Sequence, residues 1–66
     1  MTRIEITPHK NGYSPEQCGK TLSVAELIEI LQQYDKESLV YFNNDNGYTF
    51  GSINESDIEE VENEKR

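Results

Sequence analysis

The segment SVAELIEILQQY, residues 23–34, constrains the fold of this chain more than any other part of its sequence. Ser23 and Glu26 are spaced as in a capping box, in which each side chain binds a backbone amide at the other residue and so starts a helix. Apolar side chains then recur at helical spacing and form one stripe: Val24, Leu27, Ile28 and Leu31. We therefore predict a helix from about Val24 to Tyr34, whose apolar stripe packs against another layer of the protein.

Two short apolar segments after this helix predict a β-hairpin. Residues 38–42, SLVYF, are mostly β-branched, aromatic or aliphatic and too few for a second helix, and residues 48–53, YTFGSI, have a similar character. Between them lies Asn46-Gly47, a pair that favours a tight turn because both residues tolerate positive φ. The two segments are therefore expected to pair as antiparallel strands.

The length of the hairpin loop decides which side chains share a face of the sheet. A two-residue turn would place Phe42 opposite Gly51, where an aromatic side chain has little to contact. A three-residue loop, with Gly47 in a bulge, would place Phe42 opposite Phe50. We predict this bulged loop, which puts four side chains on one face: Val40, Phe42, Tyr48 and Phe50.

A third strand is predicted near the N-terminus. Residues 3–7, RIEIT, alternate between polar and apolar side chains, as half-buried strands do, and Pro8 ends the segment. Residues 8–20 contain both prolines and two of the four glycines, so we expect an irregular loop there. A chain of 66 residues suffices for one domain with a modest core. We predict a single α+β domain over residues 1–66, with element order β-α-β-β and one helix packed on a sheet of three or four strands.

Residues 55–66 form an acidic C-terminal segment. Six of the thirteen acidic residues lie between Glu55 and Glu64. Ile58 and Val61 are three positions apart, a spacing that leaves both a short helix and a strand open for residues 55–62. Such a segment can bind a basic groove on another protein, although runs of like charge are usually only solvated.

The net charge of −7 excludes some classes of partner and favours others. It opposes direct contact with nucleic acid, whose binding depends on Lys and Arg neutralising phosphates, and contact with anionic membranes. It favours a basic protein partner through faster encounter, although acidic charge also serves simple solubility. We therefore expect a protein partner rather than a nucleic acid or a membrane.

Other features indicate a cytoplasmic protein. The first ten residues, MTRIEITPHK, lack the apolar run of a secretion signal, and no later run is long enough to span a bilayer. Cys18 is the only cysteine, so the chain forms no internal disulfide, as is usual in a reducing compartment. We therefore expect a cytoplasmic location.

Two segments resemble known ligand-binding loops, and each is incomplete. FNNDNGYTFG, residues 42–51, resembles a calcium-binding loop with glycine at its sixth position, but Phe42 and Ile53 then stand where carboxylates are required. CGKT, residues 18–21, resembles the end of a phosphate-binding loop, but Ser14 stands where the pattern needs glycine. We predict that the first segment is only a turn and that the second match is due to chance.

His9 and Cys18 lie in the same predicted loop and have the chemistry of a base and a nucleophile. No third group is placed to orient the histidine, and two ligands are too few for a structural zinc site. We predict no catalytic residue, no cofactor and no metal site, and hence a protein that is not an enzyme.

The predicted interaction surface combines tyrosines with acidic residues. Tyr41 is expected to point away from the apolar face of the hairpin and to lie beside Asn43, Thr49 and Gly51. Tyrosines beside small polar residues are common in protein interfaces, although they also simply cover small sheets. The residues assigned to the interaction surface are Tyr41, Asn43, Asp45, Tyr48, Asp57, Glu59, Glu60 and Glu62.

The segment from Leu22 to Ile53 resembles short uncharacterised proteins of bacteriophages, prophages and their bacterial hosts. In those proteins a capped ELIE-L helix is followed by a Tyr-Asp turn, a V-x-F strand and an Asn/Gly-rich hairpin. The matching residues here are mainly structural: Glu26, Leu27, Ile28, Leu31, Val40, Phe42 and Gly47. The resemblance therefore implies a fold and a genomic setting, and it carries no catalytic residue.

That setting implies a class of function. Small acidic phage proteins often bind a host protein, including proteins of defence or transcription that handle nucleic acid, and block or redirect it. We therefore predict a non-enzymatic, protein-binding accessory protein of phage or mobile-element origin. The alternative is a structural protein that self-associates through a free strand edge or sheet face, and so gains the burial that its small core lacks.

Overall fold

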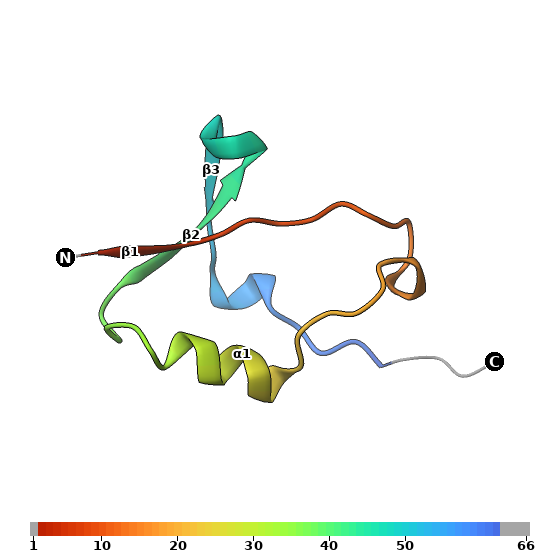
Figure 1. Cartoon of the computed structure of the whole chain (residues 1–66), viewed down its shortest axis with the longest axis horizontal. Helices are drawn as coiled ribbons and strands as arrows, with labels where there is room; N and C mark the ends of the chain where they lie inside the picture. Colours follow the sequence, from red (N-terminus) through yellow and green to blue (C-terminus); the bar gives the residue numbers. More distant parts are fainter. Residues whose placement is uncertain (1, 63–66) are drawn as a thin grey trace.

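The computed structural model describes residues 2–62, which form one helix and a three-stranded sheet (Figure 1). The elements in chain order are β1 (Arg3–Ile6), the 3₁₀ turn η1 (Pro15–Gln17), α1 (Val24–Leu31), β2 (Leu39–Asn44), η2 (Asp45–Gly47), β3 (Thr49–Ser52) and η3 (Glu55–Asp57). The strand order is β1-β2-β3, with β1 parallel and β3 antiparallel to β2. The predicted small α+β class and the order β-α-β-β are confirmed, with three strands in the sheet.

Helix α1 begins where its sequence predicts. The Ser23 hydroxyl accepts a hydrogen bond from the Glu26 amide at 3.1 Å, and the Glu26 carboxylate accepts one from the Ser23 amide at 2.9 Å. Each bond satisfies an amide that has no partner within the helix, so the capping box fixes the first turn. The predicted capping box is therefore confirmed.

The helix ends earlier than predicted, at Leu31 rather than near Tyr34. The Tyr34 amide binds the Leu31 carbonyl at 3.1 Å, a three-residue spacing that tightens the chain into a turn. The Asp35 side chain then accepts a hydrogen bond from the Glu37 amide at 2.9 Å. This side-chain turn competes with helical hydrogen bonding and directs the chain toward β2.

The hairpin register differs from the predicted one. Phe42 lies opposite Gly51 and Asn43 lies opposite Phe50, so Phe42 and Phe50 are on opposite faces and the predicted bulged loop is wrong. Four residues, Asp45 to Tyr48, separate the paired strands, one more than predicted.

The backbone of this loop explains the extra residue. Asp45, Asn46 and Gly47 all have positive φ, at 53°, 57° and 89°, and Tyr48 returns to right-handed helical angles. The Tyr48 amide binds the Asn44 carbonyl at 3.0 Å and closes the loop. The bulged loop that we predicted needs positive φ at Gly47 alone. In the structure the two preceding polar residues, Asp45 and Asn46, also have positive φ, which Asp and Asn tolerate better than most residues.

The pairing registers divide the side chains of the sheet between two faces, because side chains alternate along each strand. The inner face, which lies toward α1, consists of Ile4, Ile6, Val40, Phe42, Asn44, Thr49 and Gly51. The outer face consists of Arg3, Glu5, Leu39, Tyr41, Asn43, Phe50 and Ser52. Tyr41 therefore lies beside Asn43 as predicted, but Thr49 and Gly51 are on the inner face, contrary to the prediction.

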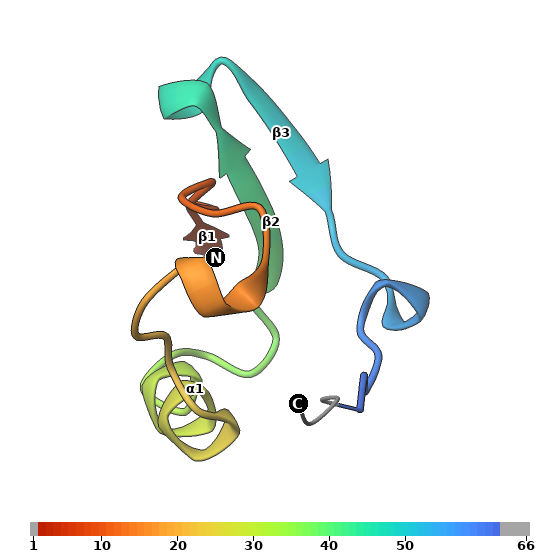
Figure 2. The same cartoon turned by 90° about the vertical axis from the view of Figure 1, so that its right-hand side faces the viewer.

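Helix α1 lies on the inner side of the sheet but does not approach it closely (Figures 1 and 2). No Cα atom of α1 lies within 8 Å of a Cα atom in the three strands. Between them runs a groove lined by Ile4 and Val40 from the sheet and by Ile28 and Leu31 from the helix. As a result, no residue within the described range 2–62 is buried.

The C-terminal segment is neither a regular helix nor a strand. After β3 the chain makes the single 3₁₀ turn Glu55–Asp57 and continues in irregular conformation to Glu62. The Asp57 side chain accepts a hydrogen bond from the Asn54 amide at 2.8 Å, which stabilises the turn. The remainder of the predicted acidic segment, residues 63–66, lies outside the described residues.

Candidate functional site

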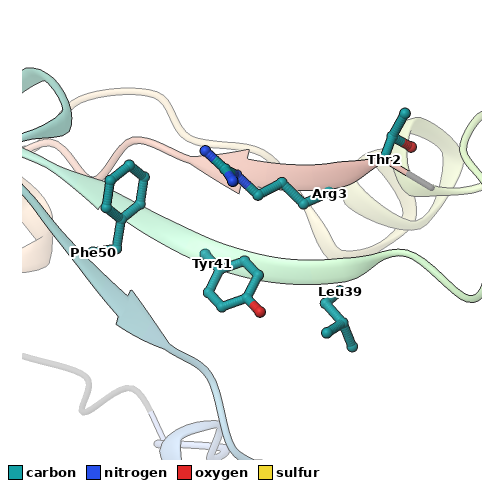
Figure 3. Close-up of a pocket in the computed structure, with 5 residues that line it drawn as sticks. All are labelled: Thr2, Arg3, Leu39, Tyr41 and Phe50. Carbon is teal, nitrogen blue, oxygen red and sulfur yellow. The ribbon is translucent and has the colours of Figure 1, made fainter.

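The outer face of the sheet brings together side chains from all three strands. Arg3 of β1, Leu39 and Tyr41 of β2 and Phe50 of β3 line a shallow hollow of ≈ 380 Å³ together with Thr2 (Figure 3). Phe50 is 48% exposed and Leu39 is 62% exposed, while Tyr41 is half-buried. Within residues 2–62, α1 lies on the other side of the sheet (Figure 2), so this apolar and aromatic surface faces solvent.

Arg3 is held in place by two neighbours on this face. Its Nε donates a hydrogen bond to Glu5 Oε2 at 2.7 Å, which is also an ion pair. Its guanidinium carbon lies 5.5 Å from the centre of the Phe50 ring, within the range of a cation–π contact. Figure 3 shows the guanidinium directed along the sheet toward that ring. The aromatic surface therefore carries an oriented guanidinium group that is paired with the carboxylate of Glu5.

Glu5 joins β1 to β2 through its side chain. While one carboxylate oxygen accepts from Arg3, Oε1 accepts a hydrogen bond from Asn43 Nδ2 at 2.8 Å. The hydrogen bond from Arg3 lowers the pKa of Glu5 below its ordinary value of 4.5, and the bond from Asn43 lowers it further. The carboxylate is therefore kept ionised, and it ties the two strands together on the outer face.

Asn43 takes part in this network through its side-chain nitrogen only. Its Oδ1 atom is buried and has no hydrogen-bond partner within residues 2–62. A buried acceptor of this kind is uncommon because losing its bond to water costs free energy.

The hairpin loop holds two further residues that the sequence assigned to the interaction surface. Asp45 begins the loop with positive φ, and Tyr48 ends it with its side chain 85% exposed. Both lie at the end of β2 and β3, beyond the paired residues. They lie at the hairpin tip and not in the hollow.

The assigned acidic residues lie elsewhere. Asp57 is in η3, and Glu59, Glu60 and Glu62 follow it in exposed, irregular chain. The hairpin tip and this segment are at opposite ends of β3 (Figures 1 and 2). The structure therefore separates the predicted interaction residues into two groups and does not join them in one patch.

Sequence reasoning missed four residues of the outer face: Arg3, Glu5, Leu39 and Phe50. A signal for the first two was present in RIEIT, where the alternation places Arg3 and Glu5 on the face opposite the isoleucines. Parallel pairing of β1 with β2 then sets Glu5 beside Tyr41. Phe50 was assigned to the wrong face because the loop length was wrong.

The loop between β1 and α1 holds His9 and Cys18, which line a second groove of ≈ 660 Å³ on the inner side. The Cys18 thiol donates a hydrogen bond to the Ser14 carbonyl at 3.6 Å. Within residues 2–62 no three side chains of His, Cys, Asp or Glu form a group that could hold a metal ion. None of the helices in this range is long and apolar enough to cross a membrane.

Comparison of the chain with protein-family models, curated proteins and solved structures gives no match. Function must therefore be inferred from the chemistry of the surfaces described above. The outer face stands out among them, because it combines exposed aromatic residues with an arginine held by two neighbours.

Proposed function

We propose that this chain is a non-enzymatic protein-binding module, an accessory protein of phage or mobile-element origin that binds a host protein in the cytoplasm. The observation that carries the proposal is the open outer face, where Tyr41 and Phe50 lie beside Arg3. Tyrosine and arginine are the residue types most often found at the energetic centres of protein interfaces, and phenylalanine is also enriched there.

The organisation of Arg3 supports a binding role. Glu5 engages its Nε atom and Phe50 lies beside its guanidinium, so the side chain is already ordered before a partner arrives. A side chain ordered in advance loses less conformational entropy on binding. The ion pair also uses only Nε, which leaves the two terminal nitrogens to donate hydrogen bonds to a partner.

The charge distribution supports a basic partner. The net charge of −7 attracts positively charged proteins over long range and accelerates their encounter. Asp45 at the hairpin tip and the exposed acidic residues after η3 provide part of this negative charge at the two ends of β3. A host protein that handles nucleic acid would carry the complementary basic surface.

The proposed origin depends on the resemblance of residues 22–53 to short proteins of phages and prophages. The residues that carry this resemblance build the capped helix and the hairpin, so they support a shared fold and genomic setting. A protein that acts in such a setting without catalysis is expected to work by occupying a surface of its target.

Affinity capture from a bacterial lysate tests the proposal. The immobilised chain is compared with the double variant Tyr41→Ala, Phe50→Ala and with Tyr13→Ala, which removes a fully exposed tyrosine from the loop before α1. We expect a basic protein that is retained by the original chain and by the loop variant, is lost from the double variant, and elutes with salt. Equal retention by all three chains would exclude the outer face as the binding surface.

A further inference from the structure

The inner side of the protein carries a second apolar surface that the chain itself leaves uncovered. Ile4 and Val40 of the sheet face Ile28 and Leu31 of α1 across a groove of ≈ 610 Å³. The helix stays away from the strands, and Ile28 and Leu31 remain 50% and 37% exposed. Apolar layers that face each other in this way normally close into a core.

The total exposed area of the chain is larger than that of a compact folded chain of the same length. The chain exposes 6691 Å², whereas a compact folded chain of this length exposes about 4,300 Å². Its radius of gyration is 13.9 Å, compared with about 11 Å for a compact domain of this length. The excess of about 2,400 Å² belongs to the chain as a whole, including its irregular segments, and the open inner side contributes part of it. An obligate homodimer interface buries about 2,000 to 5,000 Å² in total, or about 1,000 to 2,500 Å² per protomer, so the excess is large enough to contain one.

The chemistry of the inner face indicates an uncharged occupant. None of its residues, Ile4, Ile6, Val40, Phe42, Asn44, Thr49 and Gly51, carries a charge. The groove beside this face is lined by one acidic and one basic residue that are adjacent in the chain, Asp35 and Lys36, so a basic protein would find no unbalanced carboxylate there, and burying an unpaired charge is costly. The acidic character of the chain therefore does not select the occupant of the inner face.

Helix α1 of a second copy has the required surface. Its two charged residues, Glu26 and Glu29, lie on the side of the helix opposite the apolar stripe. The apolar arc is wider than one groove covers, because Leu27 and Ile30 are also 42% and 37% exposed. We propose that the inner face binds a second copy of this chain, so that α1 of each protomer covers the inner sheet face of the other.

Such a pair would be symmetric. In a two-fold interface the same surface is used by both chains, so each α1 both covers the partner's sheet and is covered in return. The outer faces then remain free on the two sides of the dimer. The dimer is independent of the proposed function, because Tyr41 and Phe50 take no part in it.

Sedimentation equilibrium over a wide range of protein concentration tests the dimer. We expect a two-chain species, a melting temperature that rises with concentration, and association that high salt strengthens by screening the like charges of the two copies. The variant Leu27→Glu, Ile30→Glu should weaken association at least about tenfold, because it places charges in the apolar contact. A monomer at every concentration, with a constant melting temperature, would overturn the proposal.

Two controls distinguish a dimer built on the inner face from one built on the outer face. Ser52→Glu adds the same kind of charge to the outer face and should leave association unchanged, as should the double variant Tyr41→Ala, Phe50→Ala. In a mixture of isotope-labelled and unlabelled wild-type chains, we expect intermolecular NOEs from Leu27 and Ile30 methyl groups to Val40. A dimer without these NOEs, or one lost on outer-face substitution, would contradict the inner-face assignment even if the helix variant failed to fold.

Discussion

Asn43 Nδ2 donates a hydrogen bond to Glu5 Oε1 at 2.8 Å, and this bond links the central strand to an edge strand whose residue lies 38 positions earlier in the chain. The other oxygen of the same carboxylate accepts from Arg3. Arg3 in turn lies over Phe50 of the third strand. The Glu5 carboxylate therefore binds residues of β1 and β2 directly, and it is linked to β3 through the contact of Arg3 with Phe50.

The lowered pKa of Glu5 predicts an acid-sensitive sheet. Because the folded state keeps this carboxylate ionised below its ordinary pKa of 4.5, the network adds stability above that pH and loses it as the pH falls through the folded value. Arg3→Gln should raise the pKa of Glu5 more than Asn43→Ala does, because the Arg3 hydrogen bond is the larger cause. NMR titration of the Glu5 carboxyl carbon measures both effects, and an unchanged pKa in the arginine variant would contradict the network.

Glu5→Gln should reduce the acid sensitivity without abolishing it. The pKa of Glu16 is also lowered, by its own backbone amide and by the Ser14 hydroxyl, so a second group contributes in the same pH range. Thermal melts recorded from neutral to acidic pH measure the difference. If the variant and the original chain lost stability equally on acidification, the contribution assigned to Glu5 would be wrong.

The two glycines of the hairpin should respond to alanine in opposite ways. A Cβ at Gly51 would lie 3.8 Å from Phe42 Cβ, an ordinary contact, and its backbone has no positive φ. Gly51→Ala should therefore stabilise the fold by about 0.5 kcal/mol through the unfolded state. Gly47→Ala should destabilise it by about 1 kcal/mol or more, because φ there is +89°. Urea unfolding compares them, and a stabilising Gly47 variant would contradict the loop conformation.

The capping box predicts a local loss of helix stability. Ser23→Ala removes the acceptor for the Glu26 amide and should cost about 1 kcal/mol. Ser23→Asp supplies an equivalent acceptor and serves as the matched control. Urea unfolding followed by circular dichroism provides the measurement, and equal stability of both variants would show that the cap contributes nothing.

Neutralising the acidic C-terminal segment should change how fast a basic partner binds. Replacing Glu59, Glu60 and Glu62 with glutamine removes three exposed charges from a segment remote from the hairpin tip. Association should become slower and less dependent on salt, while the dissociation rate stays nearly constant. Surface plasmon resonance with the captured partner separates the two rates. A large increase in dissociation alone would instead place this segment inside the interface.

Local signals in the sequence predict the elements of this fold well. The spacing of Ser23 and Glu26 predicts the start of α1, and the alternation in RIEIT predicts β1. Both signals come from residues that are close together in the chain. The end of α1 was less predictable, since the side-chain turn at Asp35 competes with the helix over the same few residues.

The candidate site was harder to predict because it depends on register. One extra residue in the hairpin loop transfers Phe50 from the inner to the outer face, and sequence alone does not reveal that both Asp45 and Asn46 adopt positive φ. Pairing Phe42 with Phe50 would have given both rings a neighbour on the inner face. In the structure Phe50 instead lies beside Arg3 of β1, a strand more than forty residues earlier in the chain. Local sequence around the hairpin does not indicate this neighbour.

Both proposed surfaces depend on this register, so its direct measurement is the most informative experiment. Cross-strand NOEs between backbone protons report which residues of β2 and β3 face each other. The structure predicts NOEs pairing Asn43 with Phe50 and Phe42 with Gly51. NOEs pairing Phe42 with Phe50 would put both aromatic rings on the inner face, and would remove Phe50 from the surface proposed to bind a host protein.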